Sequence, residues 1–207
     1  MTITQALLAF IAAATILTIT PGLDTAMVLR SATAGSPRHA VHASIGIAIG
    51  CLIWGLVVSV GLGALLAASE AAFTAVKWAG AAYLFYLGIR LVLHPRESLE
   101  VADAGAPEID PRQMFRQGLL TNLLNPKIGV FYITFLPQFV PAGVNMAFFS
   151  FLLAAIHVLL SLVWFAILIA ATVPVGRALR RPRMVKAMDR VTGGVFLAFG
   201  AKLALSR

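Results

Sequence analysis

Two short polar stretches interrupt long apolar segments of this sequence, and each places an ionisable residue beside a proline. The first is Thr20-Pro21-Gly22-Leu23-Asp24, and the second is Asn125-Pro126-Lys127. A carboxylate such as Asp24 can hold an ammonium group or carry a proton, whereas an ammonium and an amide can hold a carboxylate. Together the two stretches offer complementary partners for a small zwitterion such as an amino acid.

The composition is that of a membrane protein. Of the 207 residues, 60% are hydrophobic and only 12% are charged, and the mean hydropathy is +0.92. Soluble domains usually carry about 25% charged residues, so this chain has too little polar surface to cover a water-soluble body. The net charge is +8, and the basic residues lie between the apolar blocks. This arrangement favours contact with anionic membrane lipids and argues against binding of nucleic acid.

Six apolar stretches are long enough to cross a bilayer as helices. We expect them at about 4–29, 41–68, 73–93, 117–139, 146–173 and 185–205. An acidic loop at about 95–113 separates a first half, about 1–94, from a second half, about 114–207. The whole chain, 1–207, is therefore predicted to form one transmembrane domain.

The lysines and arginines indicate how the helices are oriented. Most of the 16 basic residues fall in the first, third and fifth connections, whereas few lie in the even connections and at the termini. Positive residues mark the cytoplasmic side. We therefore expect a multi-pass protein of the cell inner membrane with both termini outside the cytoplasm.

The two polar stretches lie in corresponding spans of the two halves. Each half has three spans, and proline interrupts the first span of each, at Pro21 and at Pro126. Because three is odd, the second half enters the membrane from the opposite side. The sequence thus predicts an all-α protein of six transmembrane helices, arranged as two inverted three-helix repeats with broken first and fourth helices. Matched breaks of this kind mark the binding site of a transporter.

Several residues at the breaks are candidates for binding substrate: Pro21, Gly22, Asp24, Asn122, Asn125, Pro126 and Lys127. Structural interpretations exist beside this one. Asp24 can cap the helix that restarts after the break, and Asn125 before a proline is typical of a helix start. Lys127 can extend to the membrane interface or pair with Asp24. Ionisable residues inside a membrane are expensive, so function is the default hypothesis.

Other polar residues carry weaker signals. His157 can relay protons, as can Asp24, or it can form a hydrogen bond between helices. The Gly46-x-x-x-Gly50 spacing favours close helix packing, either within the bundle or between the protomers of a homodimer. We expect no cofactor and no enzymatic activity, because the sequence lacks a phosphate-binding loop, a zinc-protease motif and a catalytic pair.

Longer phrases of the sequence resemble the LysE/RhtB family of bacterial amino-acid exporters. The resemblance rests on Thr20–Asp24, on Gly80–Arg90, on Phe115–Lys127 and on Phe135–Phe139, in this order along nearly the whole chain. Leu23 departs from the family pattern, which has a second proline there.

The resemblance implies a secondary active exporter of amino acids or close derivatives in the inner membrane, coupled to protons by antiport. Its partners would be a small-molecule amino acid, protons and membrane lipids. The alternatives are an exporter of a metal ion or another small solute, and a membrane subunit that transports nothing. The sparse carboxylates and the single cysteine count against metal transport.

Overall fold

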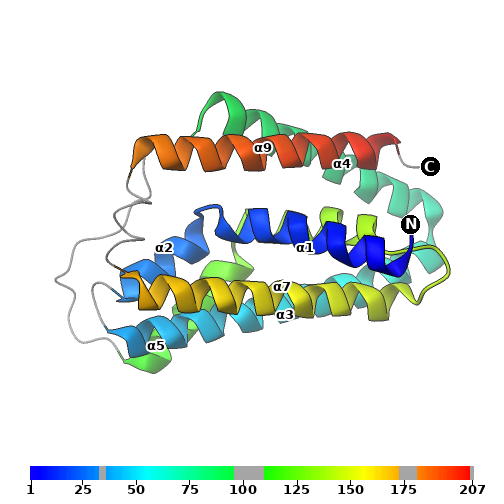
Figure 1. Cartoon of the computed structure of the whole chain (residues 1–207). Coiled ribbons are helices and arrows are strands. Elements are labelled where there is room, and N and C mark those ends of the chain that lie inside the picture. Colours follow the sequence, from blue (N-terminus) through cyan, green and yellow to red (C-terminus); the bar gives the residue numbers. More distant parts are fainter. Residues whose placement is uncertain (33–35, 96–109, 173–180, 206–207) are drawn as a thin grey trace.

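The computed structural model describes residues 1–32, 36–95, 110–172 and 181–205, which form helices joined by short connections (Figure 1). In chain order the elements are α1 (Ile3–Ile19), α2 (Leu23–Arg30), α3 (Pro37–Ala68), α4 (Glu70–Leu93), α5 (Pro111–Leu123), α6 (Pro126–Val130), the π-helical η2 (Phe131–Phe135), the 3-10 helix η3 (Leu136–Phe139), α7 (Met146–Ala170) and α9 (Pro182–Leu205). These described residues contain no strand, so the predicted all-α class is confirmed. Most of the predicted acidic loop lies outside them.

Two of the described helices, α3 and α7, are long and apolar enough to cross a membrane. Two bent pairs also qualify if each pair counts as one span: α1 with α2, bent by 53°, and α5 with the segment Lys127–Phe139, bent by 54°. Both predicted interruptions are therefore real bends. The helices α4 and α9 coincide with the predicted third and sixth spans.

Of the helices that begin a few residues earlier than the hydropathy pattern predicts, three start with a proline. They start at Pro37, Pro111 and Pro182, a few residues before the expected apolar boundaries. Proline suits the first turn of a helix, where its missing N–H is not needed. The hydropathy pattern identifies only the apolar segment of a helix, whereas these helices begin in the polar sequence that precedes it.

Small residues bring α3 and α5 into backbone contact. A Cβ atom added at Gly46 would lie 2.1 Å from the Phe115 carbonyl oxygen, and one added at Gly118 would lie 2.2 Å from the Ala43 carbonyl oxygen. One turn further along α3, a Cβ atom at Gly50 would lie 2.6 Å from the Oδ1 atom of Asn122. The predicted close packing at Gly46 and Gly50 thus occurs within the protomer.

The pair α3 and α5 lies along one face of the bundle, and the remaining helices pack on its inner side. Figure 1 shows α4 and α9 side by side along one face, with α1 between them and α7. Aromatic side chains from α1, η2 and η3 form a buried cluster at the centre, comprising Phe10, Phe131, Phe135 and Phe139. Both chain termini lie at the same end of the bundle.

The contact between α3 and α5 generates a test. Gly46→Ala should lower the thermal unfolding temperature, because the new methyl group overlaps the α5 backbone and overpacking costs about 1–3 kcal/mol. Gly61→Ala is the matched control, since nothing lies within 4 Å of a Cβ atom there. Intrinsic-fluorescence melts of both variants in the same detergent measure the effect. Equal melting temperatures would contradict the close approach.

Candidate functional site

The first helix break leaves two carbonyl oxygens without helical partners. Pro21 has no N–H, so the Leu17 carbonyl loses the donor that it would have in a continuous helix. The chain turns away after Thr20, so the Thr20 carbonyl is also released. The Lys127 ammonium donates to both, at 3.1 Å from the Leu17 oxygen and 3.3 Å from the Thr20 oxygen. A lysine from the second half of the chain therefore caps α1.

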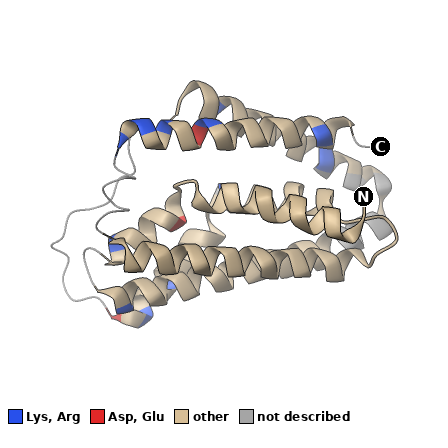
Figure 2. Ribbon diagram, in the orientation of Figure 1, with Lys and Arg blue, Asp and Glu red and all other residues tan. Residues whose placement is uncertain are grey.

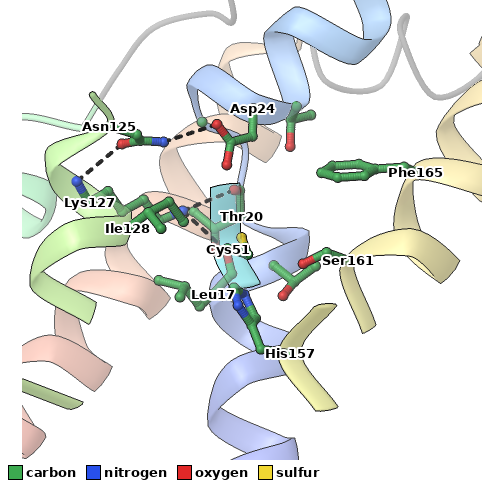
Figure 3. A pocket seen from close by; sticks show the side chains of 13 residues that line it. Leu17, Thr20, Asp24, Cys51, Asn125, Lys127, Ile128, His157, Ser161 and Phe165 are labelled. Atoms are coloured by element: carbon green, nitrogen blue, oxygen red, sulfur yellow. Dashed lines mark hydrogen bonds between the residues drawn. The ribbon is translucent and has the colours of Figure 1, made fainter. Parts of the chain in front are cut away.

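The Asp24 carboxylate on α2 receives two amide groups from the second half of the chain. The Nδ2 atom of Asn122 donates to Oδ2 at 2.8 Å. The Nδ2 atom of Asn125 donates to Oδ1 at 3.3 Å (Figure 3). An ionised carboxylate only accepts hydrogen bonds, and each oxygen has two lone pairs. Asp24 thus retains acceptor capacity for another donor. It is also attracted by the Lys127 ammonium.

The second break is satisfied largely by its own residues. The Asn125 backbone N–H donates to the Asn122 carbonyl at 3.0 Å, which replaces the donor that Pro126 lacks. The Asn125 side-chain oxygen accepts the Lys127 backbone N–H at 3.1 Å and so caps α6. The predicted capping role of Asn125 is confirmed. Its amide group has a second function, since it also holds Asp24.

A small cavity lies where the two breaks meet, with a volume of about 30 Å³. Its wall comes from α1, α2, α3, α6 and α7 and consists of Leu17, Thr18, Thr20, Gly22, Asp24, Thr25, Cys51, Asn125, Lys127, Ile128, His157, Ser161 and Phe165. A cavity of this size has room for about two or three water molecules. The structure therefore represents a contracted state, and a solute of amino-acid size requires the walls to separate.

His157 contributes to the same cavity from α7. Its ring is almost fully buried, and Nδ1 lies 2.9 Å from the Tyr132 hydroxyl. Cys51 also lines the cavity, and its sulfur accepts a hydrogen bond from the Asn122 amide at 3.3 Å. The sequence signal that could have identified Cys51 is its position directly after Gly50, in a segment predicted to pack closely on another helix.

The helix α9 reaches the site through one hydroxyl pair. The hydroxyls of Thr20 and Thr192 are both buried and are hydrogen bonded to each other. Thr20 gives its only hydroxyl hydrogen to the Ile16 carbonyl at 2.6 Å, so Thr192 is the donor of the pair. Asp189 is fully buried on the same face of α9, one turn earlier. The sequence pattern identifies neither Thr192 nor Asp189, because both follow the basic start of the helix.

The structure brings the predicted residues together. The Asn122 and Asn125 amides hold the Asp24 carboxylate, and the Lys127 ammonium binds the two carbonyls of the first break close by. Gly22 lines the cavity and is the N-cap of α2, Pro21 is buried beside it, and Pro126 occupies the first position of α6. His157 faces the cavity from a different helix (Figure 3). Within the described chain, no group of three or more His, Cys, Asp or Glu residues could hold a metal ion.

Comparison with known proteins agrees with this architecture. The family described as LysE type translocator matches residues 15–207. The chain belongs to this family. The translocator is 32% identical to the uncharacterized membrane protein YrhP of Bacillus subtilis, over 98% of this chain and 100% of that protein. It is 34% identical to an uncharacterized membrane protein of Pseudomonas aeruginosa, over 89% of this chain and 88% of that one.

A third relative has a named activity. The homoserine/homoserine lactone efflux protein of Salmonella typhimurium is 28% identical, over 96% of both chains. No solved structure matches the translocator. Family membership makes this protein a multi-pass membrane translocator with a small-molecule substrate. At the level of the family, it is an amino-acid exporter.

The capping of α1 by Lys127 generates a test. Lys127→Met should lower the thermal unfolding temperature, because it removes two hydrogen bonds from a charged donor, each contributing about 1.5–3 kcal/mol. Adding Pro21→Ala should restore part of the loss, since the new backbone N–H can bond the Leu17 carbonyl. Detergent melts of the single and double variants measure this coupling. Strictly additive effects would argue against the capping role.

Proposed function

We propose that the protein is a secondary active exporter of amino acids or close derivatives, and that its substrate binds between the two helix breaks. The observation that carries the proposal is the meeting of Asp24 and Lys127, from opposite halves of the chain, at one cavity beside two interrupted helices. A zwitterion carries one charge of each sign, so it can satisfy both residues at once. The family and the efflux activity named for one relative support the same function.

The hydrogen bonds of the site suggest how substrate binds. The substrate ammonium takes the open acceptor positions of Asp24, whose carboxylate is already held by two amides. The substrate carboxylate draws the Lys127 ammonium away from the Leu17 and Thr20 carbonyls. Because these carbonyls end α1, occupancy of the site alters the capping of the broken helix. Binding thus favours a different arrangement of α1, and alternating access follows if the two arrangements open to opposite sides.

Coupling to protons has two candidate residues. Asp24 can exchange its proton for the substrate ammonium, since both compete for the same oxygens. His157 faces the same cavity and is hydrogen bonded to Tyr132. An Asp24 that is protonated on one side of the membrane and loaded with substrate on the other would drive antiport.

Contacts between α4 and α9 support two inverted repeats. Gly88 and Gly193 approach each other closely: a Cβ atom on Gly193 would lie 2.8 Å from the Gly88 carbonyl oxygen. The phrase that contains Gly88 resembles the phrase that contains Gly200, and aligning the two phrases pairs Ala81 with Gly193. A two-fold axis then requires a second contact between Gly200 and Ala81. A Cβ atom on Gly200 would lie 3.4 Å from the Ala81 carbonyl oxygen.

The distribution of charge supports the predicted orientation in the inner membrane. Figure 2 shows lysines and arginines gathered at the end of the bundle where α2 finishes and α5 and α9 begin. Arg30, Arg112, Arg116 and Arg183 belong to this end. The opposite end holds both termini. We infer that the basic end faces the cytoplasm and that both termini lie outside.

Transport assays test the roles of the two charged residues. Asp24→Asn and Lys127→Ala should each slow amino-acid efflux from loaded proteoliposomes by at least about tenfold per folded molecule, because each loses one charge that the zwitterion needs. Asp110→Asn, at the exposed N-cap of α5, is the matched control and should leave efflux unchanged. Normal efflux from both site variants would contradict the proposed roles of Asp24 and Lys127 in substrate binding.

Reporter fusions test the orientation. Alkaline phosphatase fused after Arg207 should be active, and green fluorescent protein at the same place should be dark, because the C-terminus is expected outside the cytoplasm. The same reporters inserted after Gly105 should give the opposite pattern. A fluorescent C-terminal fusion would reverse the proposed topology.

A further inference from the structure

The span that contains the second helix break departs from α-helical geometry a second time. After α6 the chain continues as the π-helix η2 and then as the 3-10 helix η3. The Leu136 N–H donates to the Phe131 carbonyl, five residues back, whereas an α-helix uses the carbonyl four residues back. Pro137 then lacks the N–H that an α-helix would require. Short π-helical segments inside longer helices are rare and frequently occur at functional sites.

Specific contacts keep this irregular segment in place. The Gln138 side-chain amide donates to the Thr134 carbonyl at 2.9 Å, which in an α-helix would accept the Gln138 backbone N–H. The Thr134 methyl group packs on α4, where a Cβ atom added at Gly80 would lie 2.1 Å from it. The side chain of Gln138 therefore supplies a hydrogen bond that the backbone itself makes in the regular geometry.

The phenylalanines of this segment form a column of rings that leads away from the cavity. The Phe131 ring centroid lies 5.1 Å from that of His157, a residue of the cavity wall, and 4.9 Å from that of Phe135. The Phe139 ring follows, with its centroid 5.1 Å from that of Phe135. All three phenylalanines are at most 1% exposed. The helix that follows η3, α7, begins at the end of the bundle that holds both termini, so the column points to this end (Figure 1).

Two further helices complete the column. The ring centroid of Phe10, on α1, lies 5.4 Å from that of Phe139, and the ring centroid of Phe199, on α9, lies 4.1 Å from that of Phe135. Lys202 of α9 is exposed, and its Nζ atom lies 5.4 Å from the Phe139 ring centroid. The column thus extends from the cavity to the protein surface. Because protein interiors are close-packed, no solute of amino-acid size passes while these rings are in contact.

A separate apolar cluster lies on the other side of the cavity. It contains Val28 and Leu29 of α2, Ile47 of α3 and Leu168 of α7, which are fully buried, and Phe165, which also lines the cavity. The helix α2 ends at the basic end of the bundle (Figure 2). The cavity is therefore closed towards both ends, but by different structures. A regular half-helix closes the basic end, and the irregular segment η2–η3 closes the end with the termini.

We propose that η2 and η3 form the gate between the cavity and the end of the bundle that holds the termini, and that it opens when η2 rewinds from π-helical to α-helical geometry. This inference rests on the proposed function, because it takes the cavity as the substrate site. A π-helix turns less per residue than an α-helix, so rewinding rotates every later residue about the helix axis. Phe135 and Phe139 then leave the column, while α1 and α7 keep their positions.

Cys51 tests the gate, because it is the single cysteine of the chain and lines the cavity. In the unmodified protein, its reaction with a membrane-impermeant methanethiosulfonate should be slow from either side of sealed membrane vesicles, since only an accessible thiolate reacts. Phe139→Ala should raise the rate at least about tenfold from the side of the termini and leave the rate from the other side unchanged. Leu29→Ala should raise only the rate from the basic side. The reporter fusions establish which side carries the termini.

Phe148→Ala is the matched control, since this phenylalanine of α7 is 71% exposed and does not belong to the column. It should change neither rate. An unchanged rate for Phe139→Ala from the side of the termini would overturn the gate. If that variant folds poorly, Phe139→Leu should raise the same rate at least about threefold, and no change would count equally against the gate.

The thiol reaction measures access to the cavity and not efflux. A negative result therefore overturns the gate and leaves the proposed function standing. Failure of the proposed function would instead appear as normal efflux from Asp24→Asn and Lys127→Ala.

Gln138→Met tests the rewinding. It removes the side-chain donor of the Thr134 carbonyl, which the backbone N–H of the same position satisfies once η2 is α-helical. The open state should therefore gain population, and the Cys51 rate from the side of the termini should rise at least about threefold. An unchanged rate in a folded Gln138→Met protein would overturn the proposed rewinding.

Discussion

The structure depends on a carbonyl oxygen that its own helix cannot satisfy. Pro21 removes the donor of the Leu17 carbonyl in the middle of an apolar segment. Neither lipid nor the surrounding apolar side chains can replace that donor. The Lys127 ammonium does so from the other half of the chain. The break in α1 is therefore stable only when the two halves are correctly assembled around it.

The same constraint explains why the charged residues meet. Lys127 must reach back to α1, and this places the second break against the first. Asn125, which caps α6, then lies close enough to donate its amide to Asp24. Asp24 itself occupies the first turn of α2, where the helix dipole favours a negative charge. In the proposed mechanism the same side chains combine structural and binding roles, so that a substrate changes the fold locally by competing for them.

Backbone contact between α3 and α5 provides the required precision. Gly46 and Gly118 allow the two helices to approach within a distance that a side chain would prevent. Gly50 leaves space for Asn122, which is fully buried and donates to Asp24. A wider spacing between these helices would withdraw one of the two amides that hold the carboxylate. The small residues therefore orient the site although none of these three glycines contributes a polar side chain to it.

The sequence by itself determined the local features of this protein. Proline at positions 21 and 126 ends the helix that precedes it, because the N–H that would continue the helix is covalently absent. Hydropathy and length identified the helices, and the residues beside the breaks identified Asp24, Asn125 and Lys127. Only the tertiary structure decided which donors meet which acceptors. That Lys127 caps α1, and that Cys51 and Thr192 join the site, depends on contacts between residues distant in the chain, which no local pattern encodes.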